Sequence, residues 1–326
     1  MPLHPIRLCA IVLARTVLGL LALLGAASPA YAGCSTSSST LTLAPSTSYD
    51  VRAATVAQVA GSAGLSCTGS TLSLLGGSYA KATLTSANGF KLTAGGSDAL
   101  AYLVSADPGA TQTFTQGSTI DYMSANLLSL LGIGSASNFN APIYAKLVGA
   151  PNVAAGVYSD TLTVAWDYYV CSGVQVGSVC VGYEANRVTI TIQVSLTISK
   201  DCRISAPSLS FGSAPLVSQF QPVTQSVLVD CTKGAAYKIA FTNGRSGSAR
   251  PWRAMTDGSG HSLQYNLYQP DGTTIWDESN PRPSADAGTG DTNPTQMQTY
   301  IAKVNPGQTT PAAGSYSDQL VVVVSF

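Results

Sequence analysis

The most regular pattern in the chain is an alternation of apolar and polar side chains over residues 187–198. Every second position there is apolar: Val188, Ile190, Ile192, Val194, Leu196 and Ile198. A period of two predicts a β-strand with one buried face. Residues 161–168 alternate in the same way, which predicts a second strand just upstream.

One stretch of this pattern occurs twice. AAGVYSDTLTVAWDY at 154–168 returns as AAGSYSDQLVVVVSF at 312–326, and LAYLVSADPG at 100–109 parallels LQYNLYQPDG at 263–272. Two copies of one domain are therefore predicted, joined near residues 199–201. Turn signals recur between short apolar stretches, and no helical pattern of useful length follows the first 32 residues. We predict an all-β fold of two tandem antiparallel β-sandwiches of the Ig-like, pilin type.

The second copy has no counterpart of residues 187–198, because the sequence stops at the position equivalent to Tyr168. We therefore expect the C-terminal sandwich to lack its last strand. Such a sandwich has an unpaired edge and an open apolar groove, which a strand from another chain can cover. In the register of the first copy, the strand-accepting edge faces the groove with Leu320, Val322, Val324 and Phe326.

The first 32 residues have the pattern of a secretory signal peptide. A basic front precedes an apolar run at 17–27 and a small-residue cleavage signal at 30–32. The expected organisation is a signal peptide at 1–32, a self-complete N-terminal domain at 33–198 and an incomplete C-terminal domain at 199–326. An alternative is a lipoprotein cleavage box at Tyr31–Cys34, although Tyr31 stands where such boxes have Leu.

Six cysteines remain after residue 32. An even number in an exported chain predicts three disulfides, although six cysteines allow 15 pairings. Their spacing favours Cys34 with Cys67, Cys171 with Cys180, and Cys202 with Cys231. After the leader, 14 Lys and Arg oppose 16 Asp and Glu, a net charge near −2. This balance gives no reason to expect a nucleic-acid partner.

The sequence offers little for catalysis. His261 is the one histidine after the leader, and neither a GxSxG motif nor a His/Cys set with metal-ligand spacing occurs. We expect no enzymatic activity, no catalytic residue, no cofactor and no metal site.

The AGxYSDxLxVxx ending, the LQYNLY strand, the IW pair at 275–276 and the paired cysteines resemble the spore coat protein U family. Members of that family include subunits of archaic, Csu-type chaperone/usher pili. The resemblance implies that a periplasmic pilus chaperone and then an adjacent pilus subunit lend the missing strand, with an outer-membrane usher as a further partner. Cys34 stands so near the cleavage site that no donor segment is expected before it. The resemblance thus implies a two-domain tip adhesin, exported through the periplasm to the pilus tip on the cell surface, with a role in biofilm formation.

In such adhesins apolar loops attach to abiotic or host surfaces. The candidate surface-binding residues lie in three segments: Leu127, Leu128, Leu130, Leu131 and Ile133; Val59 and Leu65; and Val148 and Val153. The leucines at 127–131 also fit one face of a short helix packed on the sandwich. Two other functions stay open, a coat or envelope structural protein and a lectin-like carbohydrate-binding module.

Overall fold

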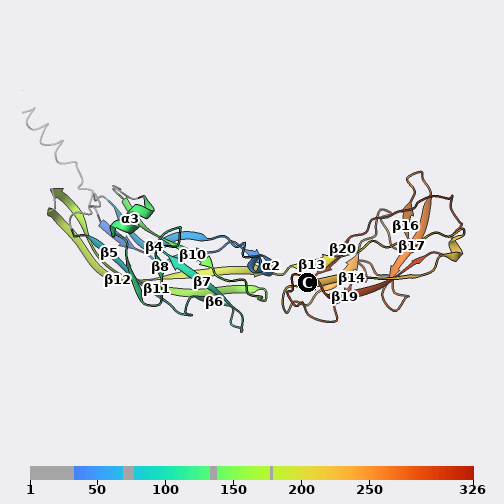
Figure 1. Cartoon of the computed structure of the whole chain (residues 1–326), viewed down its shortest axis with the longest axis horizontal. Coiled ribbons are helices and arrows are strands. Elements are labelled where there is room, and N and C mark those ends of the chain that lie inside the picture. The colour runs from blue at the N-terminus through green and yellow to red at the C-terminus, as the bar shows by residue number, and fades with distance from the viewer. Residues whose placement is uncertain (1–32, 69–76, 133–137, 177–178) are drawn as a thin grey trace, which may run out of the picture.

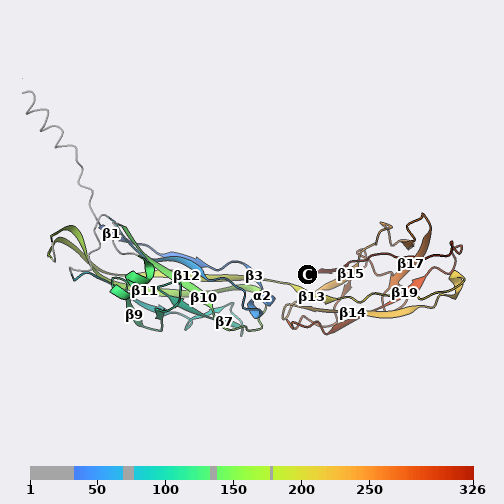
Figure 2. The ribbon, with the colours of Figure 1, turned by 45° about the horizontal axis from the view of Figure 1, so that its top comes forward.

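A computed structural model of the protein describes residues 33–68, 77–132, 138–176 and 179–326. The expected signal peptide and Ile133 lie outside the described residues. The described strands form two groups that follow one another along the long axis of the molecule (Figures 1 and 2). Nearly all regular elements are strands and most pairs are antiparallel, which confirms the predicted fold class.

The first group, here called the N-terminal sandwich, forms one twelve-stranded sheet system with two short helices. Its elements are β1 (Gly33–Thr36), β2 (Ser39–Thr42), β3 (Ser46–Thr47), α2 (Ser48–Arg52), β4 (Val59–Thr68), β5 (Tyr79–Ser86), β6 (Lys91–Thr93), β7 (Ala99–Ser105), β8 (Thr113–Phe114), β9 (Ser118–Asp121), α3 (Ala125–Leu131), β10 (Asn138–Leu147), β11 (Gly156–Val176) and β12 (Val179–Ser199).

The second group, here called the C-terminal sandwich, is smaller. It has a five-stranded sheet in the order β13-β14-β19-β17-β16 and a three-stranded sheet in the order β18-β15-β20. Its elements are β13 (Cys202–Ser205), η1 (Val217–Gln219), β14 (Val223–Cys231), β15 (Lys238–Phe241), β16 (Arg253–Thr256), β17 (Ser262–Tyr268), β18 (Arg282–Pro283), β19 (Gln296–Val304) and β20 (Val322–Ser325).

The alternating stretch at 187–198 lies in β12, as the pattern predicts. β12 pairs antiparallel with β11 from Gly156↔Ile198 to Val176↔Val179. Its apolar side chains from Ile190 to Ile198 are buried, and they complete the core of the N-terminal sandwich. On its other edge β12 pairs in parallel with β2 and β3. Both edges of this strand are therefore occupied.

Two short helices interrupt this β structure. α2 begins after Thr47, whose hydroxyl accepts a hydrogen bond from the Asp50 N–H while the Asp50 carboxylate accepts one from the Thr47 N–H. This capping box gives a five-residue helix a defined start. α3 ends at Gly132, whose φ of +68° suits glycine. The sequence did not predict α2, whereas α3 matches the alternative in which the leucines at 127–131 form one face of a short helix packed on the sandwich.

Three disulfides hold the fold. They join Cys34 to Cys67, Cys171 to Cys180, and Cys202 to Cys231, the pairs that the spacing favours. Cys34–Cys67 links β1 to β4, and Cys202–Cys231 links β13 to β14 at the equivalent place. Each sandwich also has a buried tryptophan whose indole N–H donates to a backbone carbonyl, Trp166 to Ala63 and Trp276 to Ile239.

Leu41 lies in β2, the strand that pairs with β12, and is fully buried in the N-terminal core. We expect Leu41→Ala to lower the free energy of unfolding by about 2–5 kcal/mol, because a buried leucine is replaced by a cavity. Thr40→Ala, at the exposed neighbouring position, is the matched control and should change stability by less than about 0.5 kcal/mol. Urea unfolding of both variants measures the difference. Equal losses in the two variants would contradict the placement of Leu41.

Candidate functional site

The two sandwiches differ at the strand that follows the repeated YSD sequence. In the N-terminal sandwich β11 pairs with β5 on one edge and with β12 on the other. In the C-terminal sandwich the equivalent strand, β20, pairs with β15 from Lys238↔Ser325 to Phe241↔Val322. Among the described residues no strand pairs with the other edge of β20. That edge is where β12 would lie if the second copy matched the first.

A groove of about 800 Å³ lies beside this edge. One of its walls is the segment 206–217, and another is the segment 310–320. The groove reaches down to side chains of the C-terminal core: Val227, Phe241, Leu263, Tyr265, Leu267 and Tyr300. The open edge thus adjoins a groove whose deepest part is made of apolar core side chains.

Of the four residues predicted to face the groove, three lie at the groove or its core and Phe326 does not. Leu320 and Val322 line the groove, and Val324 is partly buried against the same core. Phe326 does not line it. Its side chain is 56% exposed and its ring lies 5.1 Å from Nζ of Lys200. The expectation for Phe326 is wrong because β20 ends at Ser325, and the last residue leaves the strand beside the segment that joins the two sandwiches.

The wall at 206–217 has a counterpart in the N-terminal sandwich. Counted from Cys34 and Cys202, Leu209 corresponds to Leu41 and Phe211 to Leu43. Leu41, in the strand β2 beside β12, and Leu43 are both buried in the N-terminal core, whereas Leu209 and Phe211 are only partly buried. Residues 206–216 form no strand, although their counterparts include β2, which pairs with β12. This wall was not predicted from the sequence, although an alignment of the two copies on Cys34 and Cys202 places it.

A hydrogen bond between tyrosine and aspartate occurs once in each sandwich. The Tyr102 hydroxyl donates to Asp160 Oδ2 at 2.7 Å, and the Tyr265 hydroxyl donates to Asp318 Oδ2 at 2.6 Å. Burial raises the pKa of each tyrosine, and the hydrogen bond to the carboxylate raises it further. Both tyrosines therefore remain protonated donors at neutral pH.

The surroundings of the two pairs differ. Asp160 is 2% exposed and also accepts from the Ser86 hydroxyl, whereas Asp318 is half-buried and lines the groove. Gly244, with φ of +70°, passes so near that an added Cβ would lie 2.1 Å from Asp318 Oδ2. A carboxylate that is enclosed in the N-terminal sandwich is thus open to the groove in the C-terminal one.

The leucine-rich segment does not form an exposed loop. Leu127 and Leu128 are buried in α3, and Leu131 packs partly against the N-terminal core. Of this set the described exposed member is Leu130, with 48% of its surface accessible. The expectation that Leu127 and Leu128 contact a surface is wrong, because the apolar face of α3 packs on the sandwich.

The other two predicted loops are also corrected. Val59 and Leu65 lie within β4, where Leu65 is buried and Val59 packs partly against the core. Val153 is buried, while Val148 is 48% exposed. The segment that carries both lies next to the C-terminal sandwich, since Asn152 Nδ2 donates to the Thr289 carbonyl at 2.8 Å. It is therefore at the opposite end of the N-terminal sandwich from α3 (Figure 1).

A row of tyrosines on the outer face of the N-terminal sandwich was also missed. The rings of Tyr79 and Tyr169 stack at 6.0 Å between centroids, and those of Tyr169 and Tyr183 stack at 4.2 Å. All three are partly exposed, and Lys81 Nζ lies 4.8 Å from the Tyr79 ring. Side chains alternate between the two faces of β11, and the even-numbered ones face the core. The outward position of Tyr169 was therefore predictable from its odd number.

Within the described ranges no group of His, Cys, Asp or Glu side chains has the arrangement of a metal site. No helix in the same part of the chain is long and apolar enough to cross a membrane. The features of the described residues define a class of protein with two tandem β-sandwiches, of which the second has an open strand edge beside a groove.

The spore coat protein U domain matches the chain twice, over residues 20–165 and 188–323. The chain therefore belongs to the spore coat protein U domain family, as its C-terminal motif indicated. No curated protein matches the chain significantly.

Among solved structures, a similar chain comes from the CsuC–CsuE chaperone–tip adhesion subunit pre-assembly complex of archaic chaperone-usher Csu pili of Acinetobacter baumannii. It is 25% identical with a TM-score of 0.61, and the match covers 90% of this chain and 100% of that chain. The CupB6 tip adhesin from Pseudomonas aeruginosa is 12% identical over 82% of this chain and 85% of that one; its TM-score of 0.28 supports no conclusion. The family and the Csu complex are pilus or structural proteins and not enzymes, in agreement with the expectation from sequence.

The paired Tyr–Asp hydrogen bonds give a direct comparison of the closed and open sandwiches. We expect Tyr102→Phe to destabilise the protein by about 1–3 kcal/mol, because it removes one donor from a buried carboxylate. Tyr265→Phe should cost less, since water can reach Asp318 from the groove. Calorimetric unfolding of both variants tests this order, and a larger loss for Tyr265→Phe would contradict it.

Proposed function

We propose that the protein is the tip adhesin subunit of an archaic chaperone/usher pilus. In this proposal residues 33–198 form an adhesive domain, and residues 199–326 form a pilin domain that accepts a strand from a periplasmic chaperone and then from the adjacent subunit. The observation that carries the proposal is the groove beside the unpaired edge of β20, at the place where β12 closes the N-terminal sandwich. The similarity to the Csu complex supports the same reading.

The position of β12 in the N-terminal sandwich indicates how a partner strand would lie in the C-terminal one. There β12 runs antiparallel to β11 and parallel to β2. By equivalence, the incoming strand runs antiparallel to β20 and parallel to residues 207–210. β12 places its aliphatic side chains from Ile190 to Ile198 in the core, so the partner strand should carry an aliphatic residue at every second position. Each one buried contributes roughly 1.5–3 kcal/mol before entropic costs.

This direction fixes the polarity of the assembly. The C-terminus lies between the two sandwiches (Figures 1 and 2), so β20 runs toward the N-terminal sandwich. An antiparallel strand therefore begins near Phe326 and leaves the groove near Asp318, away from the N-terminal sandwich. If that strand is the N-terminal segment of the next subunit, the body of the subunit lies at the far end. The N-terminal sandwich then points outward from the fibre.

A synthetic peptide of residues 187–198 tests strand acceptance. Added to the full-length protein, it should raise the melting temperature, because a ligand that binds only the folded state stabilises it by mass action. The matched control peptide carries aspartate in place of Ile190 and Ile192 and should have no effect, since two charges cannot be buried against the apolar core side chains of the groove. Equal effects of the two peptides, or none from either, would exclude a strand-accepting groove.

The adhesive part of the proposal concerns the end of the N-terminal sandwich that carries α3. Leu130 is the exposed member of the predicted leucine set there, and it projects from α3, whose Leu127 and Leu128 are buried. Attachment to hydrophobic surfaces through such residues, multiplied over many pili, would support biofilm formation. The tyrosine row on the outer face favours a second candidate function, binding of a carbohydrate, because aromatic side chains with polar ends are common in binding surfaces.

Two equally exposed residues separate these possibilities. Leu130→Ser should reduce attachment of piliated cells to polystyrene several-fold, because it removes apolar contact area at the outward end. Val148→Ser is the matched control: it has the same 48% exposure but lies beside the C-terminal sandwich, so attachment should not change. Full attachment by the Leu130 variant with equal piliation would remove Leu130 from the contact surface. Inhibition of attachment by a free sugar would favour the carbohydrate-binding function.

A further inference from the structure

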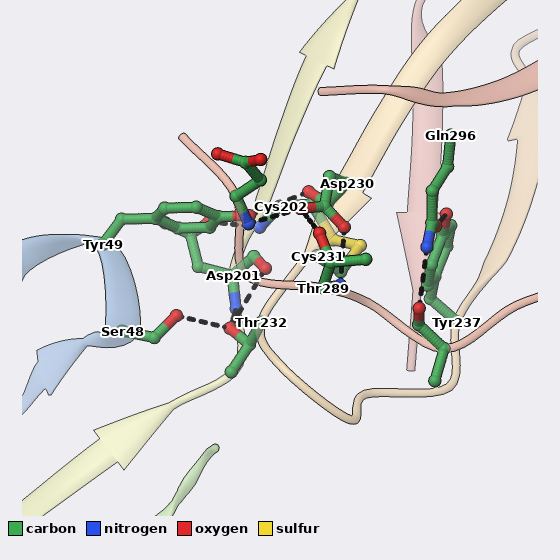
Figure 3. Close-up of a disulfide and its surroundings, with 12 residues drawn as sticks. Ser48, Tyr49, Asp201, Cys202, Asp230, Cys231, Thr232, Tyr237, Thr289 and Gln296 are labelled. Atoms are coloured by element: carbon green, nitrogen blue, oxygen red, sulfur yellow. Dashed lines mark hydrogen bonds between the residues drawn. A yellow bond between two sulfur atoms is a disulfide. The ribbon is translucent and has the colours of Figure 1, made fainter. Parts of the chain in front are cut away.

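The N-terminal and C-terminal sandwiches touch through side chains far apart in the sequence. From α2, the Tyr49 hydroxyl donates to the Asp230 carbonyl at 3.0 Å, and the Ser48 hydroxyl lies 2.9 Å from that of Thr232 (Figure 3). Tyr49 is 2% exposed and Ser48 is fully buried. Burial raises the pKa of Tyr49 to about 12, so its hydroxyl remains a donor. The contact between the two sandwiches is therefore buried from solvent at these residues.

Asp230 organises the C-terminal side of this junction. Its side chain is fully buried and accepts from the Thr289 N–H and hydroxyl, each at 2.7 Å, and from the Asp291 N–H at 2.6 Å. A carboxylate that accepts several hydrogen bonds within one turn fixes the backbone of that turn. Asp230 therefore holds the loop 289–291 in one conformation.

That loop presents two carbonyls to the N-terminal sandwich. The Gly290 carbonyl accepts from Arg52 Nη1 at 2.5 Å, and the Thr289 carbonyl accepts from Asn152 Nδ2 at 2.8 Å. Gly290 has φ of +70°, and an added Cβ would lie 2.3 Å from the Asn152 side chain. The loop is thus shaped for close approach by the other sandwich.

Charged side chains reinforce the contact. Lys233 Nζ lies 2.5 Å from Asp98 Oδ1, and this hydrogen bond lowers the pKa of Asp98. The Arg203 guanidinium lies 4.9 Å from the centre of the Tyr49 ring, within the range of a cation–π interaction. Both pairs join one sandwich to the other.

The covalent connection between the sandwiches is also held on both sides. β12 ends at Ser199, which pairs with Thr47, the cap of α2. After Lys200, the Asp201 N–H donates to Thr232 Oγ1 at 2.9 Å. Cys202 then begins β13 and forms its disulfide with Cys231. Only Lys200 and Asp201 separate the end of β12 from the start of β13. Ser199 before them pairs with Thr47, and Asp201 itself hydrogen-bonds to Thr232, so the connection is fixed to both sandwiches.

We propose that this junction is a rigid joint and that Asp230 is its positioning residue. Asp230 acts through the loop 289–291, whose carbonyls receive Arg52 and Asn152, and through its own carbonyl, which receives Tyr49. The joint keeps the N-terminal sandwich in one orientation relative to the open edge of β20. This inference rests on the proposed function, in which a fixed orientation keeps the adhesive end of the tip pointing away from the next subunit.

The experiment measures the distance distribution between spin labels at Thr189 and Ser259, exposed sites on the two sandwiches of the full-length protein. The native protein should give one narrow peak. Asp230→Asn should broaden the distribution at least two-fold, because the loop 289–291 loses its charged acceptor. Asp286→Asn, the same substitution at an exposed aspartate nearby, should leave the peak unchanged.

A second variant keeps the test decisive if Asp230→Asn does not fold. Tyr49→Phe combined with Arg52→Ala and Asn152→Ala removes three contacts from the N-terminal side and should broaden the peak similarly. A broad distribution in the native protein, or an unchanged peak in the triple variant, would overturn the rigid joint. The melting-temperature increase with the 187–198 peptide is measured on the same variants. If it persists while the peak fails to behave as expected, strand acceptance stands and the joint alone is rejected.

Discussion

The backbone of a strand edge needs hydrogen-bond partners, and the rest of this structure depends on how that need is met. In the N-terminal sandwich β12 meets it, because the strand pairs with β11 on one side and with β2 and β3 on the other. Its aliphatic side chains also cover the core. In the C-terminal sandwich the equivalent edge of β20 is open, and the side chains that β12 would cover line a groove. One strand accounts for the difference between the two halves.

Because the chain contains the same domain twice, the N-terminal and C-terminal sandwiches can be compared residue by residue. Leu209 and Phe211 occupy the positions of Leu41 and Leu43 but remain partly buried, and Asp318 repeats the hydrogen bond of Asp160 while facing the groove. Residues 206–216 form no strand, whereas their counterparts include β2, which pairs with β12. The C-terminal sandwich therefore has the side chains of a closed sandwich in an open arrangement, which is why a strand supplied by another chain fits the proposed function.

The groove and the junction between the sandwiches are neighbours. β20 ends beside the linker, where Lys200 lies over the ring of Phe326, and the linker continues into the disulfide-bonded strands β13 and β14. Asp230, at the end of β14, orders the loop that receives the N-terminal sandwich. In the proposed function, the direction of an incoming strand and the orientation of the N-terminal sandwich thus depend on adjoining parts of the structure.

The sequence alone determined the fold class, the repeat and the strand over residues 187–198, because alternation and spacing are local properties. It also predicted that Leu320 and Val322 face the groove, since register follows from the period of two. The prediction of surface-binding residues failed, because the sequence does not show whether an apolar side chain is buried in a core or exposed. Tertiary packing decided that Leu127 and Leu128 of α3 are buried against the sandwich while Leu130 of the same helix is exposed. The contacts of Tyr49, Asp230 and Asn152 join segments more than a hundred positions apart, and only the folded chain brings them together.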